Sequence, residues 1–262
     1  MFRCCALALL PWLCLPAADM PSPGGLISCA LELDKKLTAV QAQYTYTEEV
    51  RNSQVSKDGK VGTASVKTFD VVSLEGEPYR KLISLNGKPL STSQQRKVDE
   101  DFQKTQAERR AARHSPFHVE RKAYIGGLPD LIEYFDNRVT GAETVRGRPT
   151  WVMESGPKSG VSPTGKQQAE ILSWRHKSWF DQEDGTRVQW QDTVVQPVNG
   201  FQPGSEMLFE MDRGPQGPWL RSKTTSHLEV NFNRFMNARV LTVQTFTNYK
   251  KFEVNSTLTA PN

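Results

Sequence analysis

Residues 186–195 and 205–212 have the sequences TRVQWQDTVV and SEMLFEMD, and in both segments apolar and polar side chains alternate. A period of two places successive side chains on opposite faces of a β-strand. The apolar side chains that fall on one face of the two segments are Val188, Trp190, Val194, Met207, Phe209 and Met211. One apolar face and one polar face are typical of antiparallel strands with one side on a core and the other in water. Both segments are therefore predicted to be strands of an antiparallel sheet.

Strand patterns continue on both sides of these segments. Toward the N-terminus, YTYTEEVR (44–51) and TASVKTFDVVSLEG (63–76) flank the turn signal KDGK (57–60) and predict a hairpin. RPTWVMES (148–155) also has strand character. Toward the C-terminus, WLRSKTTSHLEV (219–230), ARVLTVQTFTNY (238–249) and KKFEVNS (250–256) look like three more strands, and Gly- and Pro-rich segments separate the elements.

Three segments have the pattern of helices. Residues 28–43 place Cys29, Leu33, Leu37 and Val40 at helical spacing. The apolar stripe is narrow, so we expect a helix that packs against its surroundings with one face. Residues 91–114 contain no Gly or Pro and predict a mostly solvated helix. LPDLIEYF (128–135) predicts a short amphipathic helix. Helices and strands together indicate an α+β, mainly β protein, with helices against one side of a large, curled antiparallel sheet.

The N-terminal segment MFRCCALALLPWLCLPAAD (1–19) has one early cation, an apolar stretch and two small residues before the first acid. This is the layout of a secretory signal peptide. We therefore expect residues 1–18 to be removed on export, and residues 19–262 to form a single domain with a helical insertion at about 91–115. Cleavage would leave Cys29 as the only cysteine. LISC (26–29) also looks like a lipobox, but PSPGG (21–25) separates it from the apolar stretch, so we expect a partly buried free thiol and no lipid anchor.

The composition excludes several classes of protein. With 33 Lys and Arg against 29 Asp and Glu, the formal net charge is only +4, too small to indicate a nucleic-acid-binding protein. No segment has the roughly 18–20 uncharged apolar residues that cross a bilayer, so we expect no transmembrane segment in the mature chain. A cluster of cations could contact anionic lipid or a partner, but a charged helix end offset by nearby acids is the simpler interpretation. Its members are Arg109, Arg110, Arg113, Arg121 and Lys122.

Signatures of catalysis are missing from the sequence. His114 and His118 are four residues apart, but Pro116 between them spoils a shared helical face, and neither HxH nor HExxH occurs. There is no GxSxG, no phosphate-binding loop and no GxGxxG. We therefore expect a protein that is not an enzyme, with no catalytic residue, no metal site and no cofactor. A hydrolase is the least favoured hypothesis, because no nucleophile, base and orienting residue can be proposed together.

Large apolar side chains on the predicted strands are the remaining candidates for function. On a curled sheet, inward-facing side chains either fill a core or line a cavity for a hydrophobic ligand, and periodicity does not separate the two. The candidates for the lining of a lipid-binding cavity are Tyr46, Phe69, Phe135, Trp151, Met153, Trp190, Phe209 and Met211.

Two segments resemble a known family. RVTGAETVRGRPTWVMESGP (138–157) and ILSWRHKSWFDQEDGTRVQW (171–190) are similar to the middle of the bacterial outer-membrane lipoprotein-sorting proteins, the periplasmic lipoprotein-carrier superfamily. The resemblance covers most of the mature chain and implies an open or half β-barrel of about eleven antiparallel strands, with helices covering a concave side that accepts acyl chains. The residues that carry it are Gly141, Glu143, Gly147, Arg148, Trp151, Trp179, Phe180 and Asp181.

The resemblance and the predicted export together lead to two hypotheses of function. The first is an exported, periplasmic or secreted protein that holds a lipid or acyl chain in a hydrophobic half-barrel and serves lipoprotein or lipid trafficking. The second is a non-enzymatic interaction or sensor module of the cell envelope, in which the same cavity is a filled core and the helices contact an envelope protein. The expected partners are therefore lipid or lipoprotein acyl chains and, in the second case, an envelope protein.

Overall fold

The computed structural model describes residues 20–113, 127–213, 217–233 and 236–251. The expected signal peptide lies outside these residues, as do His114, His118, Arg121 and Lys122. The helices are α1 (Pro23–Gln41), α2 (Thr92–Arg113), α3 (Leu128–Tyr134) and α4 (Lys166–Ile171). The strands are β1 (Tyr44–Gln54), β2 (Ser65–Leu74), β3 (Glu77–Leu85), β4 (Lys88–Pro89), β5 (Phe135–Val145), β6 (Arg148–Pro157), β7 (Trp174–Asp181), β8 (Arg187–Val194), β9 (Glu206–Arg213), β10 (Trp219–Asn233) and β11 (Met236–Lys251). No helix among the described residues is long and apolar enough to cross a membrane.

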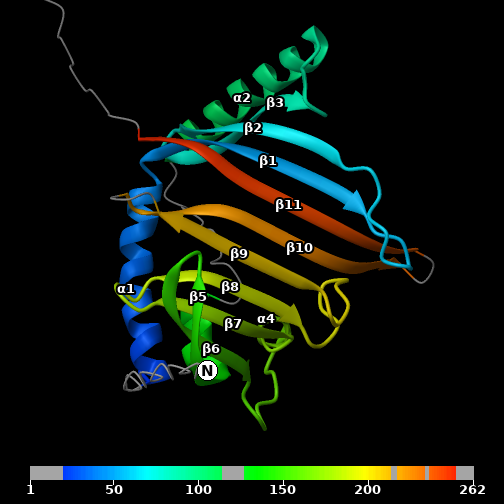
Figure 1. The fold of residues 1–262 in the computed structure, drawn as a ribbon. Coiled ribbons are helices and arrows are strands. Elements are labelled where there is room, and N and C mark those ends of the chain that lie inside the picture. Colours follow the sequence, from blue (N-terminus) through cyan, green and yellow to red (C-terminus); the bar gives the residue numbers. More distant parts are fainter. Residues whose placement is uncertain (1–19, 114–126, 214–216, 234–235, 252–262) are drawn as a thin grey trace, which may run out of the picture.

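All eleven strands form one antiparallel sheet in the order β4-β3-β2-β1-β11-β10-β9-β8-β7-β6-β5. The sheet is open, because β4 and β5 are its two edges. Every neighbouring pair is consecutive in the chain except β1 and β11, which join the N-terminal meander to the C-terminal one. The predicted fold class, an open, curled antiparallel sheet of about eleven strands with helices, is confirmed (Figure 1).

Some details differ from the sequence-based expectations. Strand β11 runs without a break from segment 238–249 into residues 250 and 251, and the rest of the expected strand 250–256 lies outside the described residues. Strand β3 was not predicted separately. Helix α1 begins at Pro23 because Ser22 caps it by accepting a hydrogen bond from the Gly25 N–H at 3.2 Å. A helix, α2, occupies the segment of the expected insertion.

One face of the sheet, here the inner face, is defined by a row of cross-strand partners that runs from β1 to β5. Partners in register point to the same side of a sheet. The row consists of Val50, Gln244, Thr224, Phe209, Trp190, Ser178, Met153 and Val139. Helix α1 crosses the strands at one end of the sheet and reaches from β5–β7 to β1–β2 (Figure 1). A pocket between the inner face and α1 at this end of the sheet would therefore have α1 as one of its walls.

The main core lies where α1 and α3 pack on the inner face of β5, β6 and β7. Its buried members are Leu26, Ile27, Ala30, Leu128, Leu131, Phe135, Val139, Met153, Ile171 and Phe180. Cys29 is exposed and lies outside this cluster, so the expectation of a partly buried thiol is wrong. The reason is that the buried face of α1 is centred on Leu26, Ile27 and Ala30, and Cys29 lies at its edge, next to Gly185 of the turn between β7 and β8.

Candidate functional site

The candidate site is a pocket of about 270 Å³ between the C-terminal turn of α1 and strands β1, β2 and β11. Helix α1 contributes Thr38, Gln41 and the C-cap residue Ala42. The remaining lining is mostly apolar and aromatic, and it consists of Tyr44, Tyr46, Val71, Val72, Ser73, Gly76, Pro78, Arg221, Phe246 and Tyr249. A small apolar pocket with few polar groups is the usual form of a site for a hydrophobic ligand.

An irregularity in the pairing of β1 with β11 gathers the aromatic side chains of the pocket. Thr45 pairs with Lys250 but Thr47 pairs with Thr247, so β11 has one residue more than β1 in this interval. Asn248 absorbs the bulge with a left-handed φ of 55°. As a result Tyr46 lies 5.0 Å from Tyr249 between ring centroids. The Tyr46 ring also meets the edge of Phe246 at 5.9 Å, which completes the aromatic floor.

Two of these tyrosines are held as neutral phenols. Burial raises the pKa of Tyr46, and the nearby Glu48 carboxylate raises it further. Burial also raises the pKa of Tyr249, with a smaller contribution in the same direction from Tyr46. The Tyr249 hydroxyl donates a hydrogen bond to the Arg221 carbonyl oxygen at 2.7 Å. At neutral pH neither tyrosine therefore brings a negative charge into the pocket.

A buried carboxylate lies beside the pocket and is fully engaged. Glu48 is 4% exposed and accepts two hydrogen bonds from Arg80, at 2.6 and 3.0 Å. Gln244 donates a third at 3.1 Å. The Arg80 guanidinium also lies 4.1 Å from the Phe69 ring centroid. This bidentate pair is the satisfied arrangement that a buried charge needs, so the charge of Glu48 is balanced within the sheet.

A second, smaller pocket of about 60 Å³ adjoins the first beneath α1. The two pockets share Gln41 and Arg221 in their linings. The second is bounded by α1 on one side and by Trp190 and Met211 of the sheet on the other. Together they mark a discontinuous groove between α1 and the inner face.

The eight candidate residues from the sequence are divided between core and pocket. Tyr46 lines the larger pocket, and Trp190 and Met211 line the smaller one. Phe135 and Met153 are buried in the main core, and Trp151 packs against it. Phe209 is buried with its ring stacked on Trp190 at 4.9 Å. Phe69 lies under Arg80 and lines neither of the two pockets.

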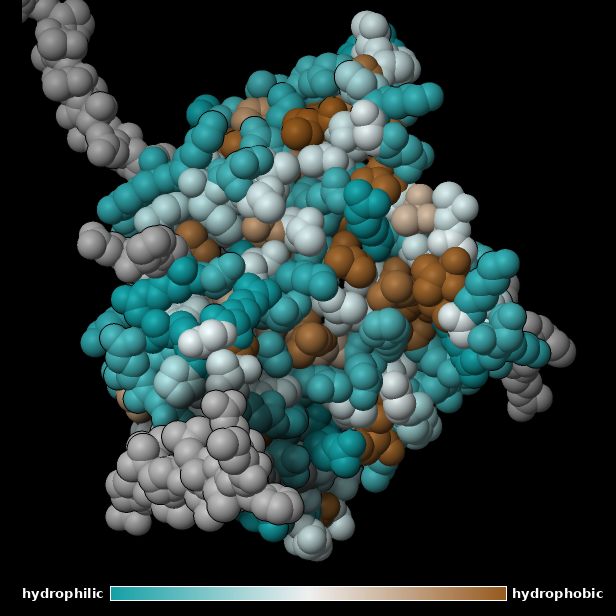
Figure 2. All heavy atoms as spheres, in the orientation of Figure 1, coloured by the Kyte–Doolittle hydropathy of each residue, from teal (hydrophilic) through white to brown (hydrophobic). Residues whose placement is uncertain are grey.

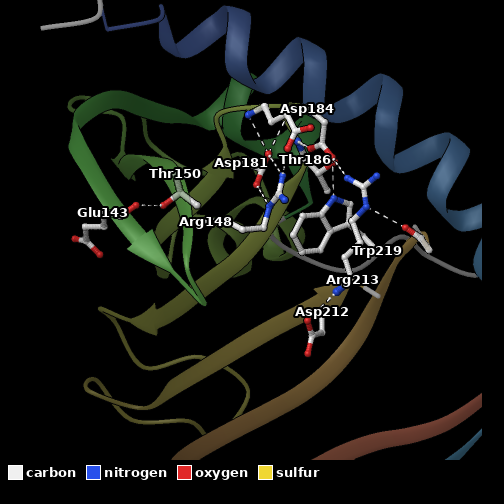
Figure 3. Close-up of polar contacts among 11 residues, drawn as sticks. Glu143, Arg148, Thr150, Asp181, Asp184, Thr186, Asp212, Arg213 and Trp219 are labelled. Atoms are coloured by element: carbon white, nitrogen blue, oxygen red, sulfur yellow. Dashed lines mark hydrogen bonds and ion pairs between the residues drawn. The ribbon is translucent and has the colours of Figure 1, made fainter. Parts of the chain in front are cut away.

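The turn between β7 and β8 contains part of the sequence motif noted above and is the centre of a network of polar contacts (Figure 3). The Asp181 carboxylate accepts hydrogen bonds from the Arg148 guanidinium at 2.5 and 3.0 Å. Burial acts to raise the pKa of Asp181, but Arg148 and the backbone N–H groups of Asp184 and Glu183 outweigh it and hold the pKa below its usual value.

The same turn reaches α1 through Trp219. Asp184 accepts hydrogen bonds from the Trp219 indole N–H at 2.9 Å and from Arg213 at 3.0 Å. The Trp219 carbonyl oxygen in turn accepts a hydrogen bond from the Gln41 side chain of α1 at 3.3 Å. Arg148 and Asp181, which the resemblance singled out, are therefore positioning residues for the helix that walls the pocket.

A cluster of polar side chains is buried on strands β6, β7 and β8, next to the main core. His176 Nδ1 lies 2.7 Å from Asp192 Oδ1, and the Phe135 ring meets the imidazole edge-on at 4.8 Å. Ser155 and Ser178 are buried nearby on the same face. Within the described part of the chain, no hydrogen-bond partner is found for either serine hydroxyl or for His176 Nε2. These residues do not form a Ser-His-Asp relay, which requires a hydrogen bond between serine and histidine. The described residues also contain no group of three metal-ligating side chains.

Sequence reasoning missed Arg221, Phe246 and Tyr249 as pocket residues. Phe246 and Tyr249 were placed on a predicted strand, but nothing marked them as neighbours of Tyr46, about two hundred positions away. The alternation of Tyr44 and Tyr46 did indicate a face. Only the pairing of β1 with β11 shows which aromatic residues share that face.

Comparisons with known proteins give structural neighbours only. No family model and no curated protein matches the chain. A putative outer-membrane lipoprotein-sorting protein domain from Vibrio parahaemolyticus is 11% identical, with a TM-score of 0.39 over 87% of this chain and 96% of that one. A LolA superfamily protein from Nitrosomonas europaea is 8% identical, with a TM-score of 0.36 over 89% and 95%.

A DUF1329 family protein from Desulfovibrio piger is 14% identical, with a TM-score of 0.36 over 89% of this chain and 94% of that one. The structural neighbours are thus lipoprotein-sorting, LolA superfamily and DUF1329 proteins, and they include the kind of protein that segments 138–157 and 171–190 resemble.

Proposed function

We propose that this chain is an exported, non-enzymatic binding protein that holds an acyl chain between α1 and the inner face of the sheet. The observation that carries the proposal is the pocket of about 270 Å³, which has an aromatic floor and a helical wall. Each methylene group that leaves water for such a pocket contributes roughly 0.8 kcal/mol. A flexible aliphatic chain gains enough from burial to bind there without specific polar contacts.

The setting that fits this activity is the bacterial periplasm, with lipid or lipoprotein trafficking as the process served. The support is the signal-peptide pattern of residues 1–18. In the view of Figure 2 the surface is mainly hydrophilic, and hydrophobic residues gather in separate patches. Such a surface suits a protein that carries its apolar cargo inside rather than on an exposed face.

Native mass spectrometry of the full chain, produced in a bacterial periplasm and purified without detergent, tests the proposal. We expect a stoichiometric extra mass that solvent extraction releases as fatty acid or phospholipid. Replacing the exposed pocket residue Thr38 by Trp should fill the mouth and abolish the extra mass. The matched control is Ala39→Trp, an exposed neighbour on α1 that lines neither the larger nor the smaller pocket. Bare wild-type protein that also takes up no fluorescent fatty acid would contradict lipid binding.

The second candidate function is the envelope interaction module, and a specific observation favours it. Four of the eight candidate cavity residues, Phe135, Trp151, Met153 and Phe209, are packed in filled parts of the structure. Helix α2 lies against strand β3, which is next to the edge strand β4. Phe102 of α2 meets Tyr79 of β3 at 5.2 Å, and the polar side of the helix is exposed. Crosslinking in cells to a single envelope protein, together with bare protein in the mass spectrum, would support this function instead.

A further inference from the structure

Arg221 is the one charged residue among the described residues that line the larger pocket. It is exposed, and its guanidinium lies 5.5 Å from the Phe246 ring centroid, on the aromatic floor. Within the described part of the chain, the guanidinium makes no hydrogen bond and no ion pair. Most other arginines of the sheet are engaged in this way, as Arg80 is with Glu48 and Arg148 with Asp181. The pocket therefore has an unneutralised positive charge at its rim.

No carboxylate of the described residues forms an ion pair with Arg221, although Asp34 shares the lining of the smaller pocket with it. The buried carboxylate beside the pocket, Glu48, is bound by Arg80 and Gln244. Tyr46 and Tyr249 are neutral phenols at pH 7, and burial raises their pKa values further above the usual value. The Tyr46 hydroxyl also has no hydrogen-bond partner among the described residues. The lining of the pocket thus contains a cation and an unpartnered hydroxyl, and both can donate hydrogen bonds to an anionic group.

The size of the pocket limits what can enter behind that anionic group. Its volume of about 270 Å³ is just below the roughly 300–1,000 Å³ of sites for drug-sized ligands. The continuation beyond Gln41 and Arg221 is smaller still, at about 60 Å³. This space suits one aliphatic chain better than the several chains of a phospholipid or an acylated lipoprotein.

We infer that the pocket binds a single-chain aliphatic carboxylate, with its head group at Arg221 and the Tyr46 hydroxyl and its chain on the aromatic floor under α1. The inference rests on the proposed function and narrows it to one class of ligand. The arrangement is physically consistent, because Arg221 is exposed and the carboxylate keeps part of its hydration while the chain is buried. A guanidinium is also the side chain whose geometry best matches a carboxylate.

The test compares dodecanoate with dodecanol, which has the same chain and no charge, by calorimetric titration of the delipidated full chain. Wild-type protein should bind dodecanoate more tightly. Arg221→Gln should weaken dodecanoate binding about tenfold or more and leave dodecanol binding unchanged. The matched control is Lys223→Gln, which removes one positive charge from the same strand at a residue that lines neither the larger nor the smaller pocket.

A second readout separates a direct contact from an indirect one. In NMR titrations of carboxyl-labelled dodecanoate, the bound carboxyl group should have a lower pKa in the wild type than in Arg221→Gln, because the guanidinium stabilises the anion. Equal affinity of wild type and Arg221→Gln for dodecanoate, or equal binding of acid and alcohol by the wild type, would overturn the inference and leave acyl-chain binding intact. Failure of the wild type to bind either ligand would instead refute the proposed function.

Discussion

Gly185 lies directly against Cys29: a Cβ atom on Gly185 would be 2.7 Å from the Cys29 sulfur. Gly185 belongs to the turn between β7 and β8 and has a φ of +77°, which disfavours any side chain. Cys29 lies near the N-terminal end of α1. The backbone of the turn therefore packs directly against α1 at Cys29. The turn is also linked to the C-terminal end of α1, because Asp184 binds the Trp219 indole and the Trp219 carbonyl oxygen binds Gln41. Both contacts set the height of α1 above the sheet.

Gly185→Ala should lower the free energy of unfolding by roughly 2–4 kcal/mol, because it combines a left-handed φ with a steric overlap. Urea unfolding measures the effect. Gly59→Ala is the control for φ alone, since Gly59 has a φ of +82° and open space around its Cα. Adding Cys29→Ala to Gly185→Ala should recover part of the loss. Equal effects at Gly59 and Gly185 would show that the contact with α1 contributes nothing.

Asp181→Asn should lower the free energy of unfolding at pH 7 by roughly 2 kcal/mol, because a charge-assisted pair with Arg148 is lost. The wild-type contribution has a defined pH dependence. The pKa of Asp181 is lower in the folded state than in the unfolded chain, so the stabilisation is present above the usual aspartate pKa of about 4 and is lost as the pH falls through the folded value. Unfolding curves at pH 7, 4 and 2.5 should therefore converge for the two proteins at acid pH. A constant difference across this range would contradict the ionic role.

Tyr46→Phe should make the protein more resistant to alkali. The folded pKa of Tyr46 is raised, so its contribution to stability is present below the unfolded value of about 10 and is lost as the pH rises through the folded value. Phenylalanine cannot ionise, and no hydrogen bond of the described residues is lost with the hydroxyl. We expect unchanged stability at pH 7 and a smaller fall between about pH 9 and 12, measured by circular dichroism. Tyr249→Phe should differ by being destabilised at pH 7 as well, since it loses the bond to Arg221.

Phe135→Ala tests which apolar residues belong to the core and which to the pocket. Phe135 is 1% exposed between α3 and the sheet, so the truncation should leave a cavity and lower the free energy of unfolding by about 3–5 kcal/mol. Under conditions where the variant is folded, its affinity for dodecanoate should equal that of the wild type. A loss of binding with little loss of stability would instead place Phe135 in the ligand cavity.

The sequence by itself determined most of the strands, their apolar faces and the class of the fold. Alternation with a period of two is a local property, and most strands display it without their neighbours, as residues 205–212 do. The three longer helices were also predictable from local spacing. Strand β3 was not predictable in this way, because its sequence EPYRKLISL mixes charged and apolar residues on both faces. It forms because it pairs with β2 and because Tyr79 contacts Phe102 of α2.

Only the tertiary structure decided where a ligand can bind. The pocket exists because β1 pairs with β11 and because a bulge at Asn248 turns Tyr249 toward Tyr46, two residues 203 positions apart in sequence. Likewise, the sequence shows Arg221 as one basic residue among 33. That it forms no ion pair with any described residue follows from where the carboxylates lie in the folded structure. Alternation is set by neighbouring residues, whereas pairing, bulges and charge balance depend on hydrogen bonds and contacts between distant parts of the chain.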